Sequence, residues 1–232
     1  MKYLFLICLL YLATNLGAQQ AELTEIKQLV NSFEKNQDLE SLKNANQKLT
    51  KLFKEKDLSR DLNALIFRSK VLSLVYDNIA LDDPTTVTTE LYKTYSAALS
   101  ADKNNIYRTQ LLNELYDNKA KIVTNGNKAY ENKDYKFAHS CAETALKLNA
   151  LEIEYPKTAA IDTSVLFSKA IFAKLSNNSD VAIKDFEKLV DMKFYRSDPY
   201  DYLFELYTQA NLTEKAEKIR TLKAERFPEN ER

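Results

Sequence analysis

Apolar residues recur every three to four positions along most of the chain, with polar residues between them. In residues 21–33 the apolar positions are Leu23, Ile26, Leu29, Val30 and Phe33. An α-helix turns once about every 3.6 residues, so this spacing places them on one helical face. The same period predicts further helices over about 39–56, 59–79, 85–100, 106–132, 135–149, 157–175, 180–192, 199–210 and 213–227. We therefore predict an all-α fold.

Polar residues and prolines mark the turns between these helices. Asp38 has the side chain of a helix N-cap, and the run at residues 82–84 ends in a proline, which lacks the amide donor that a helix needs. Residues 102–105 predict another turn, and Pro199 suits the first turn of its helix. Because the turns are short, we expect consecutive helices to form antiparallel pairs.

The glycine content excludes several classes of protein. The 232-residue chain has two glycines, Gly17 and Gly126, where average usage predicts roughly sixteen. Tight hairpins, Gly-rich phosphate loops and dinucleotide-binding fingerprints need glycine, because only glycine adopts positive φ freely. We expect Gly126, which lies inside a predicted helix, to permit close contact with a neighbouring helix.

The first residues have the order of a secretory signal peptide. Lys2 supplies a positive charge, residues 3–12 are uniformly apolar, and small residues follow at Gly17 and Ala18. The apolar run is too short to cross a bilayer, which takes roughly 20 residues. We therefore expect a signal peptide over residues 1–18, cleavage after Ala18, and no transmembrane segment afterwards.

Removal of the signal would leave one histidine and one cysteine, His139 and Cys141. Two positions apart on a helix, they point in different directions, so we expect Cys141 in the core and His139 at the surface. Structural zinc takes about four such ligands, and a catalytic triad would depend on His139 alone. We predict no catalytic residue, no metal and no cofactor, although two carboxylates could still act as acid and base.

A two-helix unit with small residues at fixed places occupies residues 125–149. Gly126 lies in its first helix and Ala138 opens its second, and counterparts of Ala138 recur at Ala182 and Ala216, after spacings of 44 and 34 residues. This pattern resembles the tetratricopeptide repeat (TPR), a helix pair with a period of about 34 residues.

The resemblance implies a right-handed α-solenoid of about five antiparallel helix pairs. Residues 19–104 would hold divergent TPR-like pairs, and residues 105–232 would hold clearer repeats that continue the same array. The chain departs from the family pattern at Ala142 and Arg220, which stand where an aromatic residue is usual. An unrelated helical bundle is the alternative architecture.

In this family, residues on the inner face of the first helices contact partners. The resemblance and the helical phase together give nine candidate partner-binding residues: Val123, Asn127, Tyr130, Phe167, Ile171, Lys174, Asp201, Glu205 and Thr208. The last three include two carboxylates, which favours a ligand with a basic or amine-bearing end.

The 33 basic residues equal the 33 acidic ones, so we expect no nucleic-acid partner. The resemblance and the signal predict a non-enzymatic, exported scaffold that holds a protein or peptide on the concave face of a TPR array. The chain resembles exported proteins of Gram-negative bacteria of the Bacteroidetes group, so we expect it in the periplasm, in peripheral association with the outer membrane, or outside the cell.

Two other functions stay open at this point. One is a glycan-binding or small-ligand-binding component of an uptake system, which should carry an aromatic platform on the concave face. The other is a helical hydrolase, which should hold two carboxylates in a deep pocket, one of them with a raised pKa.

Overall fold

The computed structural model describes residues 20–78, 84–154 and 160–228. Within these ranges the regular structure is helical and contains no strand, which confirms the all-α prediction. The predicted signal peptide, residues 1–18, lies outside the described residues. The chain divides into two compact units, Met1–Leu111 and Leu112–Arg232.

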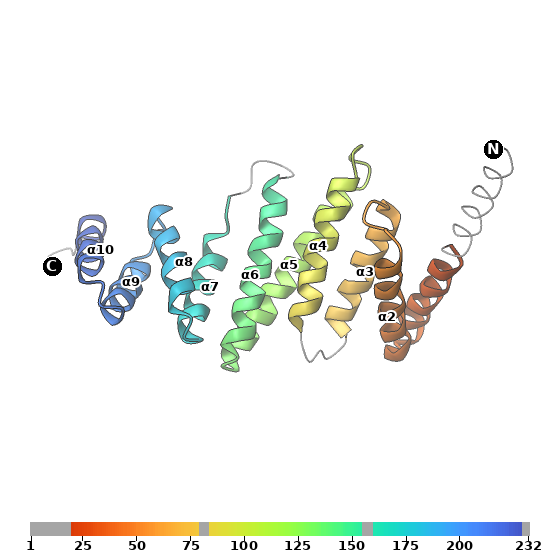
Figure 1. Ribbon diagram of the computed structural model, residues 1–232, viewed down its shortest axis with the longest axis horizontal. Coiled ribbons are helices and arrows are strands. Elements are labelled where there is room, and N and C mark those ends of the chain that lie inside the picture. Colours follow the sequence, from red (N-terminus) through yellow and green to blue (C-terminus); the bar gives the residue numbers. More distant parts are fainter. Residues whose placement is uncertain (1–19, 79–83, 155–159, 229–232) are drawn as a thin grey trace, which may run out of the picture. The chain divides into compact units, whose positions relative to one another are not determined.

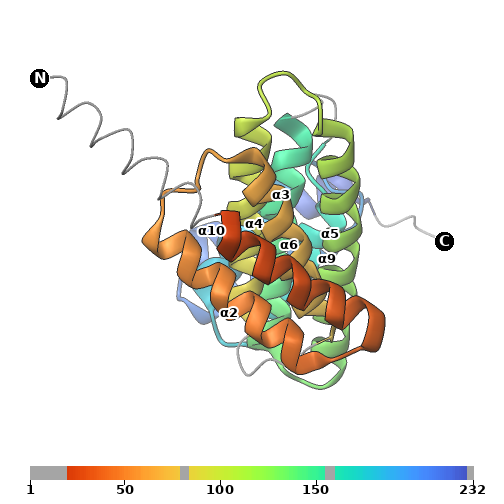
Figure 2. The ribbon, with the colours of Figure 1, turned by 90° about the vertical axis from the view of Figure 1, so that its right-hand side faces the viewer.

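In the first unit, residues 20–36 form a helix that lies beside α2 (Leu39–Glu55), as Figures 1 and 2 show. α2 packs on α3 (Leu62–Asn78), and α3 packs on α4 (Pro84–Ala101). The apolar stripe predicted for the first helix is buried, because Ile26, Val30 and Phe33 are at most 2% exposed. The pattern therefore identified the core-facing side of this helix correctly.

In the second unit, consecutive helices also pack on one another. α5 (Arg108–Glu131) begins at the end of the first unit and runs into the second. α6 packs on α7, α7 on α8, α8 on α9 and α9 on α10 (Figure 1). These helices span Tyr135–Glu154 (α6), Thr163–Leu175 (α7), Ser179–Asp191 (α8), Asp198–Gln209 (α9) and Thr213–Arg226 (α10). A buried apolar cluster extends from α7 to α10.

Aspartate side chains set several helix starts. Asp38 caps α2 as predicted. The Asp162 carboxylate accepts hydrogen bonds from the backbone amides of Ser164 and Val165, so α7 begins at residue 163 and not near 157 as predicted. Asp102 accepts in the same way from two backbone amides ahead of α5. Each carboxylate satisfies amides that have no partner inside the helix.

Four helix ends in the second unit close in the same way. Lys133, Asn177, Lys193 and Asn211 have φ between 56° and 63°, in the left-handed region. After each of them, the next amide donates to the carbonyl five residues earlier, at 2.8 to 3.0 Å. This is the Schellman motif, in which glycine is the usual left-handed residue. A chain poor in glycine has used lysine and asparagine at these positions.

Gly126 brings α5 close to α6, as predicted. A Cβ atom added to Gly126 would lie 2.9 Å from the Cβ of Cys141 and 3.5 Å from the backbone oxygen of Ala138. Ala138 and Cys141 are at most 1% exposed, which also confirms the core position predicted for Cys141. The two helices therefore touch through small side chains with no space to spare.

Replacing the left-handed lysine after α8 should stabilise the protein. Lys193→Gly removes the steric penalty of a Cβ at positive φ, so we expect the free energy of unfolding to rise by about 1 kcal/mol. Lys184→Gly, at an exposed position inside α8, should lower it by a similar amount. Urea denaturation followed by circular dichroism measures both free energies. A change of the same sign in the two variants would contradict the conclusion that Lys193 is strained by its positive φ.

Adding one methyl group at Gly126 should destabilise the protein. Alanine is the better helix former by about 1 kcal/mol, but overpacking a tight contact costs about 1–3 kcal/mol. We expect Gly126→Ala to lower the free energy of unfolding in urea by about 1 kcal/mol, with Lys128→Ala on the exposed side of α5 as a near-neutral control. A Gly126→Ala protein at least as stable as the parent would show that the helix contact is looser than described.

Candidate binding sites

Val123 and Asn127, two of the three candidate residues of α5, line a hollow that α6 and α7 complete. Its volume is about 190 Å³, and we call it the α5–α7 hollow. Tyr130 stands beside it, 42% exposed, with its ring centre 5.3 Å from that of Phe172. The residues that line the hollow include Val123 and Asn127 of α5, Ala142 of α6, and Ser164, Ser168 and Phe172 of α7. The α7 positions were not among the residues predicted from the sequence.

The α7 candidates occupy a different face of their helix. Phe167 is 8% exposed, and its ring packs at 5.5 Å from Phe194 in the apolar cluster. Ile171 is half-buried and packs against the same cluster. α7 contacts α6 on one side and α8 on the other, so its strongest apolar stripe is used for packing. Ser164, Ser168 and Phe172, spaced by four, form the face that is left for the hollow.

The acidic candidates of α9 are already paired within the chain. Asp201 lies 2.6 Å from the ammonium of Lys223, and Glu205 lies 3.0 Å from that of Lys174. The hydroxyl of Thr208 donates to a carbonyl of its own helix. A basic ligand end would therefore have to displace two lysines before it met a free carboxylate.

A larger cavity lies in the first unit, between α2, α3 and α4. Its volume is about 540 Å³, and we call it the α2–α4 cavity. α3 contributes Leu65, Arg68 and Leu72, which are spaced at one helical face. Arg68 is only 8% exposed, although it carries a charge. Its guanidinium carbon lies 4.3 Å from the centre of the Phe53 ring of α2.

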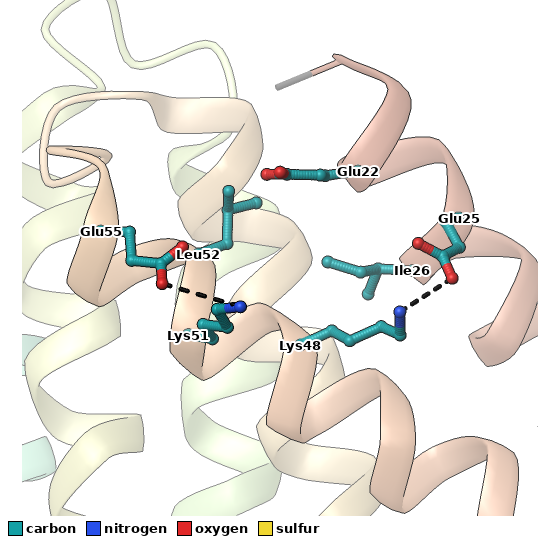
Figure 3. Close-up of a pocket in the computed structure, with 7 residues that line it drawn as sticks. All are labelled: Glu22, Glu25, Ile26, Lys48, Lys51, Leu52 and Glu55. Atoms are coloured by element: carbon teal, nitrogen blue, oxygen red, sulfur yellow. Dashed lines mark hydrogen bonds and ion pairs between the residues drawn. The ribbon is translucent and has the colours of Figure 1, made fainter. Parts of the chain in front are cut away.

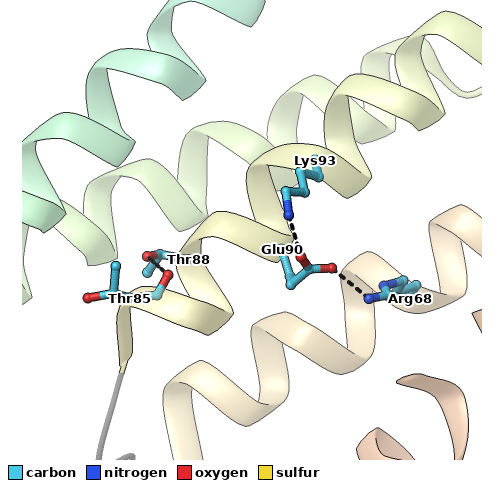
Figure 4. Close-up of polar contacts among 5 residues, drawn as sticks. All are labelled: Arg68, Thr85, Thr88, Glu90 and Lys93. Atoms are coloured by element: carbon cyan, nitrogen blue, oxygen red, sulfur yellow. Dashed lines mark hydrogen bonds and ion pairs between the residues drawn. The ribbon is translucent and has the colours of Figure 1, made fainter. Parts of the chain in front are cut away.

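Glu90 of α4 holds two cations at this cavity, as Figure 4 shows. Its carboxylate accepts from Arg68 at 2.7 Å and from Lys93 at 2.9 Å. Burial raises the pKa of Glu90, but the Lys93 and Arg68 hydrogen bonds and charges outweigh it, so the net pKa is lowered. Burial lowers the pKa of Arg68, and Glu90 partly opposes this. Arginine stays charged at any physiological pH, so the pair is ionic.

A third hollow lies between the helix at residues 20–36 and α2, and both helices contribute residues to it (Figure 3). Ile26 and Leu52 form its floor, at most 3% exposed. Ion pairs stand along its sides, including Lys48 with Glu25 at 2.8 Å. These side chains are about half exposed, so each ion pair contributes little to stability. The lining holds more glutamates than lysines, so it has no excess of positive charge.

His139 lies in a charged cluster formed by α6, α7 and α8, and is half-buried where we had expected a surface position. Burial lowers the pKa of His139, and the nearby Lys169 lowers it further, against the opposing charges of Glu143 and Asp185. Lys169 forms an ion pair with Asp185 at 2.9 Å. The imidazole is therefore neutral at pH 7 and is surrounded by groups that already neutralise one another.

Over the described residues, no three His, Cys, Asp or Glu side chains come together in a way that would hold a metal ion. Among the described helices, none is both long and apolar enough to span a bilayer. No protein-family model and no curated protein matches this chain. We therefore infer the function of the protein from the geometry and charge of these sites.

Acid should destabilise the protein through its one histidine. The pKa of His139 is lower in the folded protein than in the unfolded chain, where it is about 6.5. Below pH 6.5 the unfolded chain therefore takes up a proton while folded His139 stays neutral. The contribution of His139 to stability is complete above about pH 6.5 and is lost as the pH falls toward the folded pKa. We expect the melting temperature to be constant above about pH 6.5 and to fall as the pH is lowered below that value, and His139→Gln to remove much of that fall. An unchanged pH profile in His139→Gln would refute this assignment.

Proposed function

We propose that the protein is a non-enzymatic scaffold that holds an extended segment of a protein or peptide along the α5–α7 hollow. One observation carries the proposal: Val123 and Asn127, chosen from helical phase as partner contacts, line this hollow. Its volume of about 190 Å³ suits one or two small side chains of a bound segment. Tyr130, which is 42% exposed, adds aromatic area beside the buried Phe172 of the lining, and partly exposed aromatics are frequent anchors of interfaces.

A TPR-like, right-handed solenoid is part of this proposal. Ala138, Ala182 and Ala216 are at most 4% exposed, as expected for the small residues at which TPR helices meet. The repeated left-handed turn after α5, α7 and α9 comes five residues before each of these alanines, which supports a common unit. Repeated units of this kind bury their apolar faces against their neighbours and leave an extended surface for partners.

Export to the cell envelope is the second part of the proposal. It rests on the order of charge, apolar run and small residues over residues 1–18. Periplasmic and outer-membrane locations are both compatible with that signal.

Small-ligand binding is the second candidate function, and the α2–α4 cavity is the observation that favours it. Hydrolysis by a carboxylate pair has less support there. Glu90 is the one carboxylate among the described residues lining this cavity, and its pKa is lowered, whereas a general acid at neutral pH needs a raised one.

Partner capture tests the scaffold proposal. The tagged protein would be purified from its native envelope, and co-purifying proteins identified by mass spectrometry. Asn127→Trp places a large side chain in the α5–α7 hollow, so we expect it to lose the partner while circular dichroism stays unchanged.

The matched control is Lys136→Trp, which introduces the same side chain at an exposed position of α6 outside the hollow. This variant should keep the partner at the parental level. Equal capture by Asn127→Trp and Lys136→Trp would place the interaction elsewhere, and the absence of any reproducible partner would count against a scaffold.

A further inference from the structure

The α2–α4 cavity has the dimensions of a small-molecule site. Its volume of about 540 Å³ lies within the range of roughly 300–1,000 Å³ that is usual for ligand pockets. Helix faces from α2, α3 and α4 form most of its walls, and Ser59 in the turn between α2 and α3 completes them. The cavity is distinct from the α5–α7 hollow, so a ligand bound here would not depend on the proposed scaffold function.

The charged groups that line this cavity are predominantly basic. Lys54, Arg68 and Lys93 carry three positive charges, and Glu90 carries the one negative charge among the described lining residues. Because the single Glu90 carboxylate is shared by Arg68 and Lys93, it cannot neutralise both. The excess positive charge lies on the exposed Lys54 and Lys93 beside the nearly buried Arg68, and it favours an anionic ligand in this cavity.

Arg68 keeps hydrogen-bonding capacity for such an anion. Its Nη2 donates to Glu90, but a guanidinium carries five N–H donors in a planar fork that matches a carboxylate. Contact with the ring of Phe53 and the bond to Glu90 hold this fork in place. Lys54 and Lys93 are exposed at the rim, where they would attract the anion and remain solvated.

The uncharged residues that line the cavity are apolar and neutral polar in equal number, and most of the lining surface is apolar. Phe53, Leu65, Leu72, Val87 and Ala97 contribute side chains to its walls. A small inorganic anion would leave this surface in water, whereas burying an attached alkyl chain gains about 0.8 kcal/mol for each methylene group. Asn46 and Thr50, one turn apart on α2, add neutral polar groups that can orient a ligand.

From this arrangement we infer that the α2–α4 cavity binds a small amphipathic carboxylate, such as a medium-chain fatty acid. The carboxylate lies against Arg68 and within reach of Lys54 and Lys93. The alkyl chain lies along the apolar side chains of α3 and α4. Glu90 acts as a positioning residue, because it holds Arg68 and Lys93 without touching the ligand.

Isothermal titration of the purified protein with three probes tests the ligand class. Octanoate carries both the charge and the chain, octanamide lacks the charge, and acetate lacks the chain. We expect saturable binding of octanoate and roughly tenfold weaker binding of octanamide. Acetate lacks six methylene groups of octanoate, so we expect it to bind more weakly by on the order of a thousandfold. Equal affinity for octanoate and octanamide, or no saturable binding of octanoate, would overturn the inference.

Matched variants test the position of the site. Lys54→Gln removes an exposed rim charge, so the fold should persist while the affinity for octanoate falls by roughly fivefold or more. Lys51→Gln makes the same change one turn earlier on α2, outside the cavity, and should bind octanoate like the parent protein. Arg68→Gln should weaken octanoate binding further than Lys54→Gln, while octanamide binding changes little. Identical effects of Lys51→Gln and Lys54→Gln would show a general charge effect and refute the site.

Discussion

Close approach of neighbouring helices is the constraint on which this structure depends. No single helix pair can hide its apolar stripe, so each helix must also pack against the next one in the chain. Small residues make that possible: Gly126 meets Cys141 and Ala138 with no space for an added methyl group, and Ala182 is completely buried in the next pair. Cys141 is buried and forms no disulfide, so it contributes packing and no cross-link. The second unit is held together by fit between helices more than by any covalent or metal tie in its described residues.

The turns follow from the same constraint. A helix that must reverse within a few residues needs a left-handed residue at its end, and this chain supplies lysine or asparagine where glycine is usual. Asparagine tolerates positive φ better than lysine, so Lys133 and Lys193 store more strain than Asn177 and Asn211. The repeated geometry despite unfavourable residues shows that packing on both sides of the turn dictates the backbone there. Local propensity alone would not have produced it.

The helices and the buried faces could be predicted from the sequence, because periodic apolar residues report directly on which side of a helix is covered. The predicted helix starts were less accurate. Several residues before a helix can act as its N-cap, and the apolar pattern does not show which one does, as with Asp162 ahead of α7. The face of α7 that was predicted to contact a partner is not the one that lines the hollow. α6 and α8 pack against α7 and cover the apolar stripe that contains Phe167. Which face of α7 stays open depends on this packing, and the sequence of α7 alone does not give it. The α2–α4 cavity had one signal in the sequence: Arg68 stands in the apolar stripe between Leu65 and Leu72, where a charge needs a partner.

The directions of the pKa shifts define the charge that two of the described sites carry at neutral pH. The pKa of Glu90 is lowered by its cations after burial is offset, so this carboxylate stays ionised at neutral pH. The pKa of His139 is lowered by burial and by Lys169, so this imidazole stays neutral. At neutral pH, Glu90 therefore presents a negative charge and His139 presents none. In the α2–α4 cavity, the ionised Glu90 accepts hydrogen bonds from both Arg68 and Lys93, so it fixes where the positive charge of that cavity lies.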